Sequence, residues 1–325
     1  MPKPKKDLEL NIGEHSFMGY SDEVYAQLPI SEKVDYMLGL AEKYTSPRIS
    51  QFIREHYKIS TRIYFQEPEK GRVEGLSKFG GLPLAPAGFE FPKDAEGNPA
   101  LFIAQIHIGE FNQWHISTRE FKGGGVIYFF GTIVEKNGTH SLKEILVRYS
   151  DQVSELQEIP LPEGLKDFGT YPEMDMMIFE EMNIPGSQGC LVDHENLSDD
   201  DELLYDEMEE ILNSIYNPES FRLLGHPNSV QHCVQFQTEM KRQKVLFYGD
   251  GEYDNDSFME GYLKLRPLSL DWRLLLELDA SVLPKLPGYK GDFNAAMDGI
   301  FFVMIREKDM EDMRLEKAVS VYQCT

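Results

Sequence analysis

Two apolar segments of the sequence each carry a pair of polar side chains that could do chemistry. Alternation places Gln105 and His107 on one face of the first segment, and Glu277 and Asp279 on one face of the second. Buried polar groups of this kind cost about 1–3 kcal/mol each unless they have partners. If the two halves pack about a pseudo-twofold axis, the four side chains converge on one cleft. The alternative is that they pair with backbone or face solvent at strand ends.

A second set of candidates lies in loops rich in glycine and proline. The segments Gly80-Gly-Leu-Pro83 and Leu223-Leu-Gly-His-Pro227 have similar residues in the same order. Glycine gives the backbone freedom and proline fixes φ, so both segments should form ordered turns. The candidate loop residues are Gly80, Gly81, Arg222, His226, Gln231 and Asp292. For the histidine, hydrogen bonding within its loop is the commoner explanation, and turn formation also accounts for the aspartate.

Several familiar chemistries find no support in the residue spacing. His226, His232 and Cys233 match no zinc pattern, and residues 250–256 lack the glycine and glutamate of an EF-hand loop. The glycines 123–125 are not followed by the lysine of a phosphate-binding loop. The sequence therefore predicts no metal and no cofactor. It contains no recognised catalytic motif, which favours a binding protein over an enzyme.

The most acidic stretch runs from Asp193 to Leu212, where ten of twenty residues are Asp or Glu and none is Lys or Arg. Ser198 starts a capping box, and apolar residues recur at helical spacing from Leu204 to Ile215. We expect one amphipathic helix with a very acidic outer face. A solvated face is the commoner explanation of such a pattern, and a partner-binding element is the alternative. The candidate partner-binding residues are Asp199, Asp200, Asp201, Glu202, Glu209 and Glu210.

The charge balance limits the partners. The 325 residues include 55 acidic and 32 basic side chains, for a net charge of −23. This charge repels nucleic acid and anionic membrane surfaces, whereas a basic protein partner fits it. The three cysteines are far apart and odd in number, which argues against a disulfide framework. Without a signal peptide or a membrane span, we expect a cytoplasmic protein.

The N-terminal region is expected to be helical. Ser31 is a candidate N-cap, and Ser46-Pro47 fits a cap followed by proline at the first helical position. A strand is predicted for Lys58–Gln66, where the β-rich part begins.

Three pieces of the first half recur in the same order in the second half. They are the proline turn, an apolar strand (Ala100–His107, then Trp272–Asp279) and a glycine-led strand (Gly123–Phe130, then Asp298–Ile305). We interpret this recurrence as a divergent duplication, although apolar strands flanked by glycine can also recur by chance.

The predicted fold class is α+β, with a helical N-terminal region followed by a β-rich core of mixed or antiparallel strands in two divergent repeats. We treat residues 1–325 as a single duplicated unit. Its parts are a helical region (1–57), a first β-rich half (58–150), a connection with the acidic helix (151–217) and a second β-rich half (218–325).

The motifs from Ile59 to the end resemble those of the YwqG-like proteins. The resemblance rests on Ser77-Lys-Phe-Gly-Gly-Leu-Pro, Phe102-Ile-Ala-Gln-Ile, Leu223-Leu-Gly-His-Pro and Gly299-Ile-Phe-Phe-Val-Met-Ile, with Tyr322-Gln323 at the close. It implies a domain of unknown function that is mainly bacterial, and hence a fold without an assigned activity. Glu277 stands where that family tends to have glutamine, which puts in doubt any role that needs a neutral amide there.

These observations favour a binding module that recognises a basic protein through its acidic surface. One version is an immunity-type or antidote protein. The alternative is an enzyme or small-ligand-binding protein with a cleft between its two halves. The sequence does not address the oligomeric state.

Overall fold

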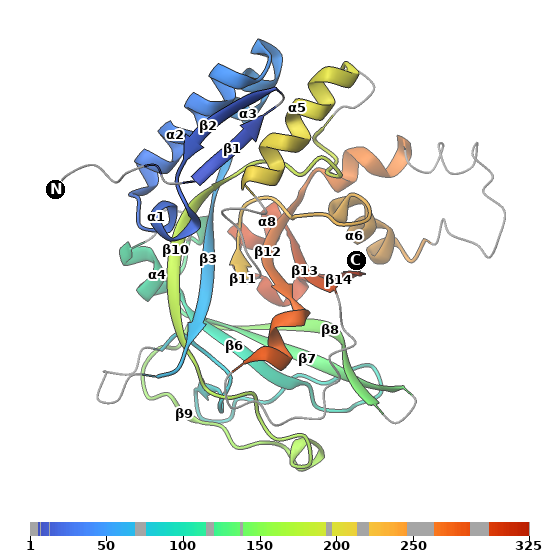
Figure 1. Ribbon diagram of the computed structural model, residues 1–325. Coiled ribbons are helices and arrows are strands. Elements are labelled where there is room, and N and C mark those ends of the chain that lie inside the picture. The colour runs from blue at the N-terminus through green and yellow to red at the C-terminus, as the bar shows by residue number, and fades with distance from the viewer. Residues whose placement is uncertain are drawn as a thin grey trace.

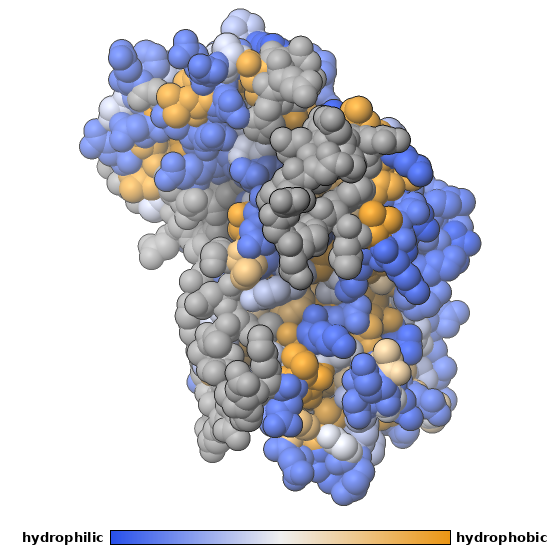
Figure 2. Space-filling model, turned by 90° about the vertical axis from the view of Figure 1, so that its right-hand side faces the viewer, coloured by the Kyte–Doolittle hydropathy of each residue, from blue (hydrophilic) through white to orange (hydrophobic). Residues whose placement is uncertain are grey.

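The protein combines helices with antiparallel sheets, which confirms the predicted α+β class. The computed structural model describes residues 6, 8–12, 14–68, 76–114, 120–136, 139–192, 197–212, 221–245, 263–286 and 299–324. Within these ranges no helix is both long and apolar enough to cross a membrane. The described residues on the face shown in Figure 2 are mainly hydrophilic, as the charged composition leads one to expect.

The chain opens with a β-hairpin that we did not expect. Strand β1 (Leu8–Ile12) pairs with β2 (His15–Gly19). The segment Leu-Glu-Leu-Asn-Ile alternates apolar and polar residues, so Leu10 and Ile12 turn towards the core on one face. The helices therefore begin later than we expected for residues 1–57.

Three helices follow the hairpin: α1 (Asp22–Ala26), α2 (Ile30–Tyr44) and α3 (Pro47–His56). The N-cap of α2 is Pro29, so the predicted cap at Ser31 is wrong by two residues. The prediction for α3 is confirmed. The Ser46 hydroxyl accepts a hydrogen bond from the Ile49 amide at 3.3 Å, and proline occupies the first helical position.

Two sheets form the body of the molecule. The six-stranded sheet has the order β10 (Asp175–Asn183), β3 (Lys58–Gln66), β11 (Phe221–Leu223), β12 (Trp272–Asp279), β13 (Gly299–Arg306) and β14 (Val319–Cys324). The four-stranded sheet has the order β4 (Lys78–Phe79), β6 (Leu101–His107), β7 (Val126–Lys136) and β8 (Thr139–Ser150). The strands predicted for residues 58–66, 100–107 and 272–279 therefore form, within a residue of the expected ends.

Shorter elements surround the sheets. They are the pair β5 (Leu84–Ala85) and β9 (Gln157–Glu158), the helices α4 (Ile108–Trp114), α5 (Asp199–Glu210), α6 (Val234–Gln243) and α8 (Glu307–Glu311), and a 3-10 turn at Ala280–Lys285. Figure 1 shows the N-terminal helices at one end of the molecule and the four-stranded sheet at the other, with β3 and β10 spanning the distance between them.

One hydrophobic core joins the two sheets. Ala104 and Ile106 of β6 lie in the same buried cluster as Leu276 and Leu278 of β12. A second cluster joins the hairpin and the N-terminal helices to the end of β10 and to α5, with Met182 among its members. Burial of these side chains is the main stabilising contribution to the fold.

The strands β4-β6-β7-β8 and β11-β12-β13-β14 have the same order and the same antiparallel pairing. Lys78 lies opposite Gln105 in the first set, and Arg222 lies opposite Glu277 in the second. The register is irregular just before each of these pairs. The irregularity lies between Phe102 and Ala104 in β6 and between Leu274 and Leu276 in β12.

The turns after β4 and β11 also correspond. Gly80 and Gly81 have φ values of 65° and 67°, and Leu224 and Gly225 have values of 60° and 84°. Two consecutive left-handed residues are costly for side chains, which explains why glycine holds three of these four positions.

Candidate functional site

The four residues expected to form one cleft do not converge. Gln105 lies opposite Tyr128, which belongs to a cluster on the outer side of the four-stranded sheet. Glu277 lies opposite Phe302, which belongs to a cluster on the outer side of the six-stranded sheet. Directly paired side chains share a face, so these two polar groups point away from the core between the sheets.

Gln105 and Glu277 hold the turns after β4 and β11 in place. Gln105 Oε1 accepts a hydrogen bond from the Leu84 amide at 2.8 Å, and its Nε2 donates to the Leu76 carbonyl at 2.6 Å. Glu277 Oε2 accepts one from the Asn228 amide at 2.9 Å. Their polar atoms therefore find backbone partners, as the alternative interpretation expected.

His107 and Asp279 lie at the ends of their strands. His107 is half-buried, and its Nδ1 is 3.7 Å from Glu110 Oε1. Asp279 Oδ1 accepts a hydrogen bond from the Ser281 amide at 2.8 Å and so caps the following 3-10 turn. Neither side chain contributes to a shared pocket with Gln105 or Glu277.

The candidate loop residues separate into different roles. Gly80 and Gly81 form the left-handed turn after β4. Gln231 is exposed, and its backbone amide donates to Gln323 Oε1 at 3.2 Å. Asp292 lies outside the described residues. Arg222 and His226 are buried. Arg222 belongs to a strip of buried ion pairs and His226 to a pocket, and both are described below.

A buried ionic strip crosses the outer face of the six-stranded sheet. Arg62 pairs with Glu181, and Arg222 lies 3.6 Å from Glu181 and 3.5 Å from Glu277. Burial raises the pKa of Glu277, and the neighbouring Arg222 opposes that rise. Sequence reasoning found two members of the strip and missed the partners on β3 and β10, although charged residues in apolar strands were a usable signal.

The acidic helix forms as expected at α5. The Ser198 hydroxyl accepts a hydrogen bond from the Asp201 amide at 3.2 Å, which confirms the cap. Asp199, Asp200 and Glu210 are exposed. Asp201 and Glu202 are half-buried, as is Glu209, whose carboxylate accepts a hydrogen bond from the Ser187 amide at 2.6 Å. Glu209 thus holds a loop in place.

Two cysteines form a disulfide that the sequence argument missed. Cys190 and Cys233 are bonded with their Cα atoms 5.5 Å apart. They are 43 residues apart in the chain, so their spacing gave no indication of contact. Cys324 is free and exposed.

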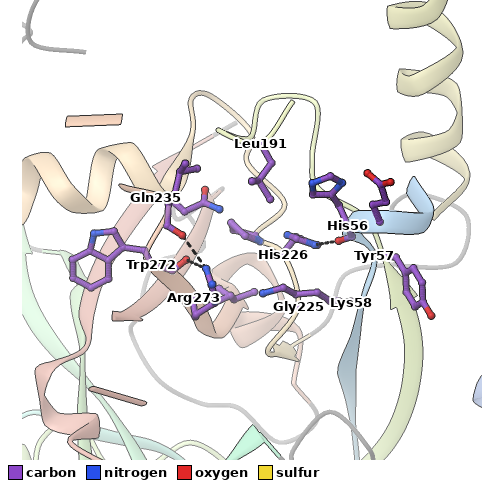
Figure 3. A pocket seen from close by; sticks show the side chains of 13 residues that line it. His56, Tyr57, Lys58, Leu191, Gly225, His226, Gln235, Trp272 and Arg273 are labelled. Carbon is purple, nitrogen blue, oxygen red and sulfur yellow. Dashed lines mark hydrogen bonds between the residues drawn. The ribbon is translucent and has the colours of Figure 1, made fainter. Parts of the chain in front are cut away.

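A pocket of about 280 Å³ lies where the end of α3 and the start of β3 meet β12 and the turn after β11 (Figure 3). Its lining residues are Glu55, His56, Tyr57, Lys58, Leu191, Gly225, His226, Pro227, Gln235, Leu270, Trp272, Arg273 and Leu274. These segments are far apart in sequence, so only the folded sheet brings them together.

Two cations face this pocket. Lys58 is half-buried, and within the described part of the chain no hydrogen bond or ion pair involves its ammonium group. Burial lowers the pKa of Lys58, and the nearby Arg273 lowers it further against the pull of Glu120 and Glu307. Arg273 donates to Glu307 Oε2 at 2.8 Å and to the Leu270 carbonyl at 2.9 Å.

His226 supplies a neutral ring on the same wall. The side chain is 4% exposed, and its Nε2 lies 2.7 Å from the His56 carbonyl oxygen. Burial, with Lys58 next in effect, lowers the pKa of His226 to about 3. The ring is therefore neutral at ordinary pH. Since a carbonyl only accepts, Nε2 carries the proton and Nδ1 keeps a lone pair.

This arrangement suits the binding of an oxyanion. Lysine and arginine donate charge-assisted hydrogen bonds to carboxylate or phosphate oxygens, and the neutral imidazole can accept one from the ligand. Across the described ranges, no group of three His, Cys, Asp or Glu side chains is placed to hold a metal ion. Sequence reasoning named His226 but missed Lys58 and Arg273, because each looks like an ordinary charged residue near a strand end.

Comparison with known families matches most of the chain to one family. Residues 77–324 match a family described as a domain of unknown function, DUF1963, and comparison with curated proteins finds no match. The matched region begins just before β4 and includes both four-stranded sets, with α6 and β12 of the pocket. The chain belongs to the DUF1963 family of domains of unknown function.

Proposed function

We propose that the protein binds a small ligand carrying a carboxylate or phosphate group in the pocket of Lys58, His226 and Arg273. The observation that carries this proposal is the Lys58 ammonium group, which lies half-buried beside a second cation without an ion-pair partner in the described residues. Burying an ammonium group without an ion-pair partner raises the free energy of the unliganded site, and an anion beside it lowers that free energy. The volume of about 280 Å³ suits a small metabolite.

The test is a titration by isothermal calorimetry with inorganic phosphate and with succinate, and with glycerol as the neutral comparison. We expect Lys58→Ala to weaken binding of the effective anion by about tenfold, which corresponds to the loss of one charge-assisted contact. Lys143→Ala is the matched control, because Lys143 lies on β8 of the other sheet and is exposed. If neither anion binds, or if both variants bind as the wild type does, the proposal is wrong.

A second candidate is recognition of a basic protein by the outer face of α5, as an immunity-type protein would do. It is supported by Asp199, Asp200 and Glu210, which are exposed and make no ion pair within the described ranges. The test is binding of a lysine-rich peptide at low and high salt. Salt-sensitive binding that is lost in the Asp199→Asn, Asp200→Asn, Glu210→Gln triple variant would support it, and equal binding by that variant would refute it.

We further propose that the chain is of the YwqG-like type and that its two four-stranded sets descend from a duplication. The common strand order, the shared register irregularity and the paired left-handed turns support this origin. So does Tyr322, which stands beside Gly299 as Tyr149 stands beside Gly125.

A further inference from the structure

The Cys190–Cys233 disulfide joins two walls of the pocket. Cys190 directly precedes Leu191, and Cys233 lies two residues before Gln235. Leu191 and Gln235 both line the pocket. Cys233 is also the N-cap of α6, so the bond ties the loop before Leu191 to the beginning of that helix.

The start of this loop is attached to a different helix, α5. The Tyr205 hydroxyl donates to the Pro185 carbonyl at 2.5 Å, and the Ser187 amide donates to Glu209 at 2.6 Å. Both contacts hold the start of the loop to α5. At the other end of the loop, the Arg266 guanidinium donates to the Cys190 carbonyl at 3.4 Å, and Cys190 packs in one cluster with Phe236 and Met240 of α6. Breaking the disulfide would therefore remove the covalent tie between the Leu191 wall and α6 and leave only these weaker contacts, which is a local change.

Of the two cysteines, Cys233 is the more exposed. Cys233 is half-buried and follows the exposed residues Gln231 and His232, whereas Cys190 is buried. A thiolate of a dithiol can attack Cys233 Sγ, which breaks the protein disulfide and releases the Cys190 thiolate. The second thiol then attacks the mixed disulfide and releases Cys233. The protein gains two electrons and two protons, and the dithiol becomes a disulfide.

The position of Cys233 favours the reduced form. As a thiolate it would lie at the N-terminus of the ten-residue helix α6, where the helix dipole and free amides stabilise negative charge. In the present state its sulfur already lies 3.4 Å from the Phe236 amide, which donates to it.

We propose that Cys190–Cys233 is a redox-active disulfide that exchanges with dithiol reductants, and that its reduction loosens the pocket and weakens anion binding. This inference rests on the proposed function of the pocket. The physical reason is loss of preorganisation, because a ligand must then order the freed wall when it binds.

The experiment uses the full chain with Cys324→Ser, which removes the exposed third thiol and leaves the pair intact. Protein oxidised and protein reduced with dithiothreitol are compared in three measurements: alkylation of the two cysteines, hydrogen exchange of residues 185–192, and calorimetric binding of phosphate and succinate. The Cys190→Ser, Cys233→Ser double variant reproduces the reduced state without reductant. We expect reduction to speed exchange in the loop and to weaken anion binding by about tenfold.

The outcomes separate the two proposals. Equal anion binding in both redox states would overturn the redox inference and leave the pocket function standing. Absence of binding in both states would refute the pocket function, and with it the inference that depends on it. Loss of the folded state on reduction, seen by circular dichroism, would also overturn the inference, because the bond would then be a structural cross-link.

Discussion

At the scale of single residues, His226 makes the free energy of unfolding depend on pH. The folded protein keeps its imidazole neutral down to about pH 3, whereas the unfolded chain takes up a proton near the ordinary value of 6.5. The unfolded state therefore binds more protons in this range, so the contribution is complete above pH 6.5 and is lost as pH falls towards 3. The free energy of unfolding should fall by up to about 1.4 kcal/mol per pH unit through this residue.

This prediction is checked by urea unfolding of the wild type and of His226→Gln between about pH 7 and pH 5. The variant should lose less stability over that range than the wild type does. His15→Gln is the control, since His15 is exposed. Parallel pH dependences for the wild type and His226→Gln would contradict the assignment of a neutral buried ring.

Glu277 and Gln105 occupy equivalent positions in the two sets of strands, one as a carboxylate and one as an amide, so substitution of Glu277 tests whether the charge is needed there. Each accepts a hydrogen bond from the backbone amide of the turn beside it. Glu277→Gln keeps that acceptor and removes a carboxylate whose desolvation offsets its attraction to Arg222, so stability should change by less than about 1 kcal/mol. Glu277→Ala removes the same carboxylate and also leaves the Asn228 amide without its acceptor, so it should cost about 3 kcal/mol. Chemical denaturation measures both, and equal losses would show that the charge itself is required.

At the scale of elements, the start of α3 is a place where sequence and structure agree. Ser46→Ala removes the hydroxyl that accepts the Ile49 amide and should lower the free energy of unfolding by about 1 kcal/mol. Ser50→Ala is the matched control, because Ser50 lies half-buried inside the same helix and its hydroxyl donates to the Pro47 carbonyl instead of capping a free amide. Thermal unfolding compares the two, and an equal effect would mean that the cap contributes nothing.

The elements also show what a sequence can and cannot predict. The α3 cap and the strand at Lys58–Gln66 follow from local signals, so they could be predicted to the residue. The hairpin β1–β2 was missed because its alternation covers only five residues per strand. The pocket and the disulfide depend on contacts between distant segments, such as Lys58 with Arg273, and no local pattern encodes them. The expected cleft failed because alternation fixes which residues share a face, and not which face meets the other sheet.

At the scale of the whole molecule, the two sheets should unfold together because they share one core. Leu276 on β12 packs in the same buried cluster as Phe129 on β7, although they belong to different sheets. Leu276→Ala leaves a cavity in that cluster and should cost about 2–5 kcal/mol.

If the sheets form one cooperative unit, the free energy of opening measured by hydrogen exchange should fall by the same amount at β7 as at β13. Leu263→Ala, at an exposed leucine outside the cluster, is the control and should change neither. Faster exchange confined to β13 would mean that each sheet unfolds by itself, and a ligand that binds beside β12 would then stabilise only that half.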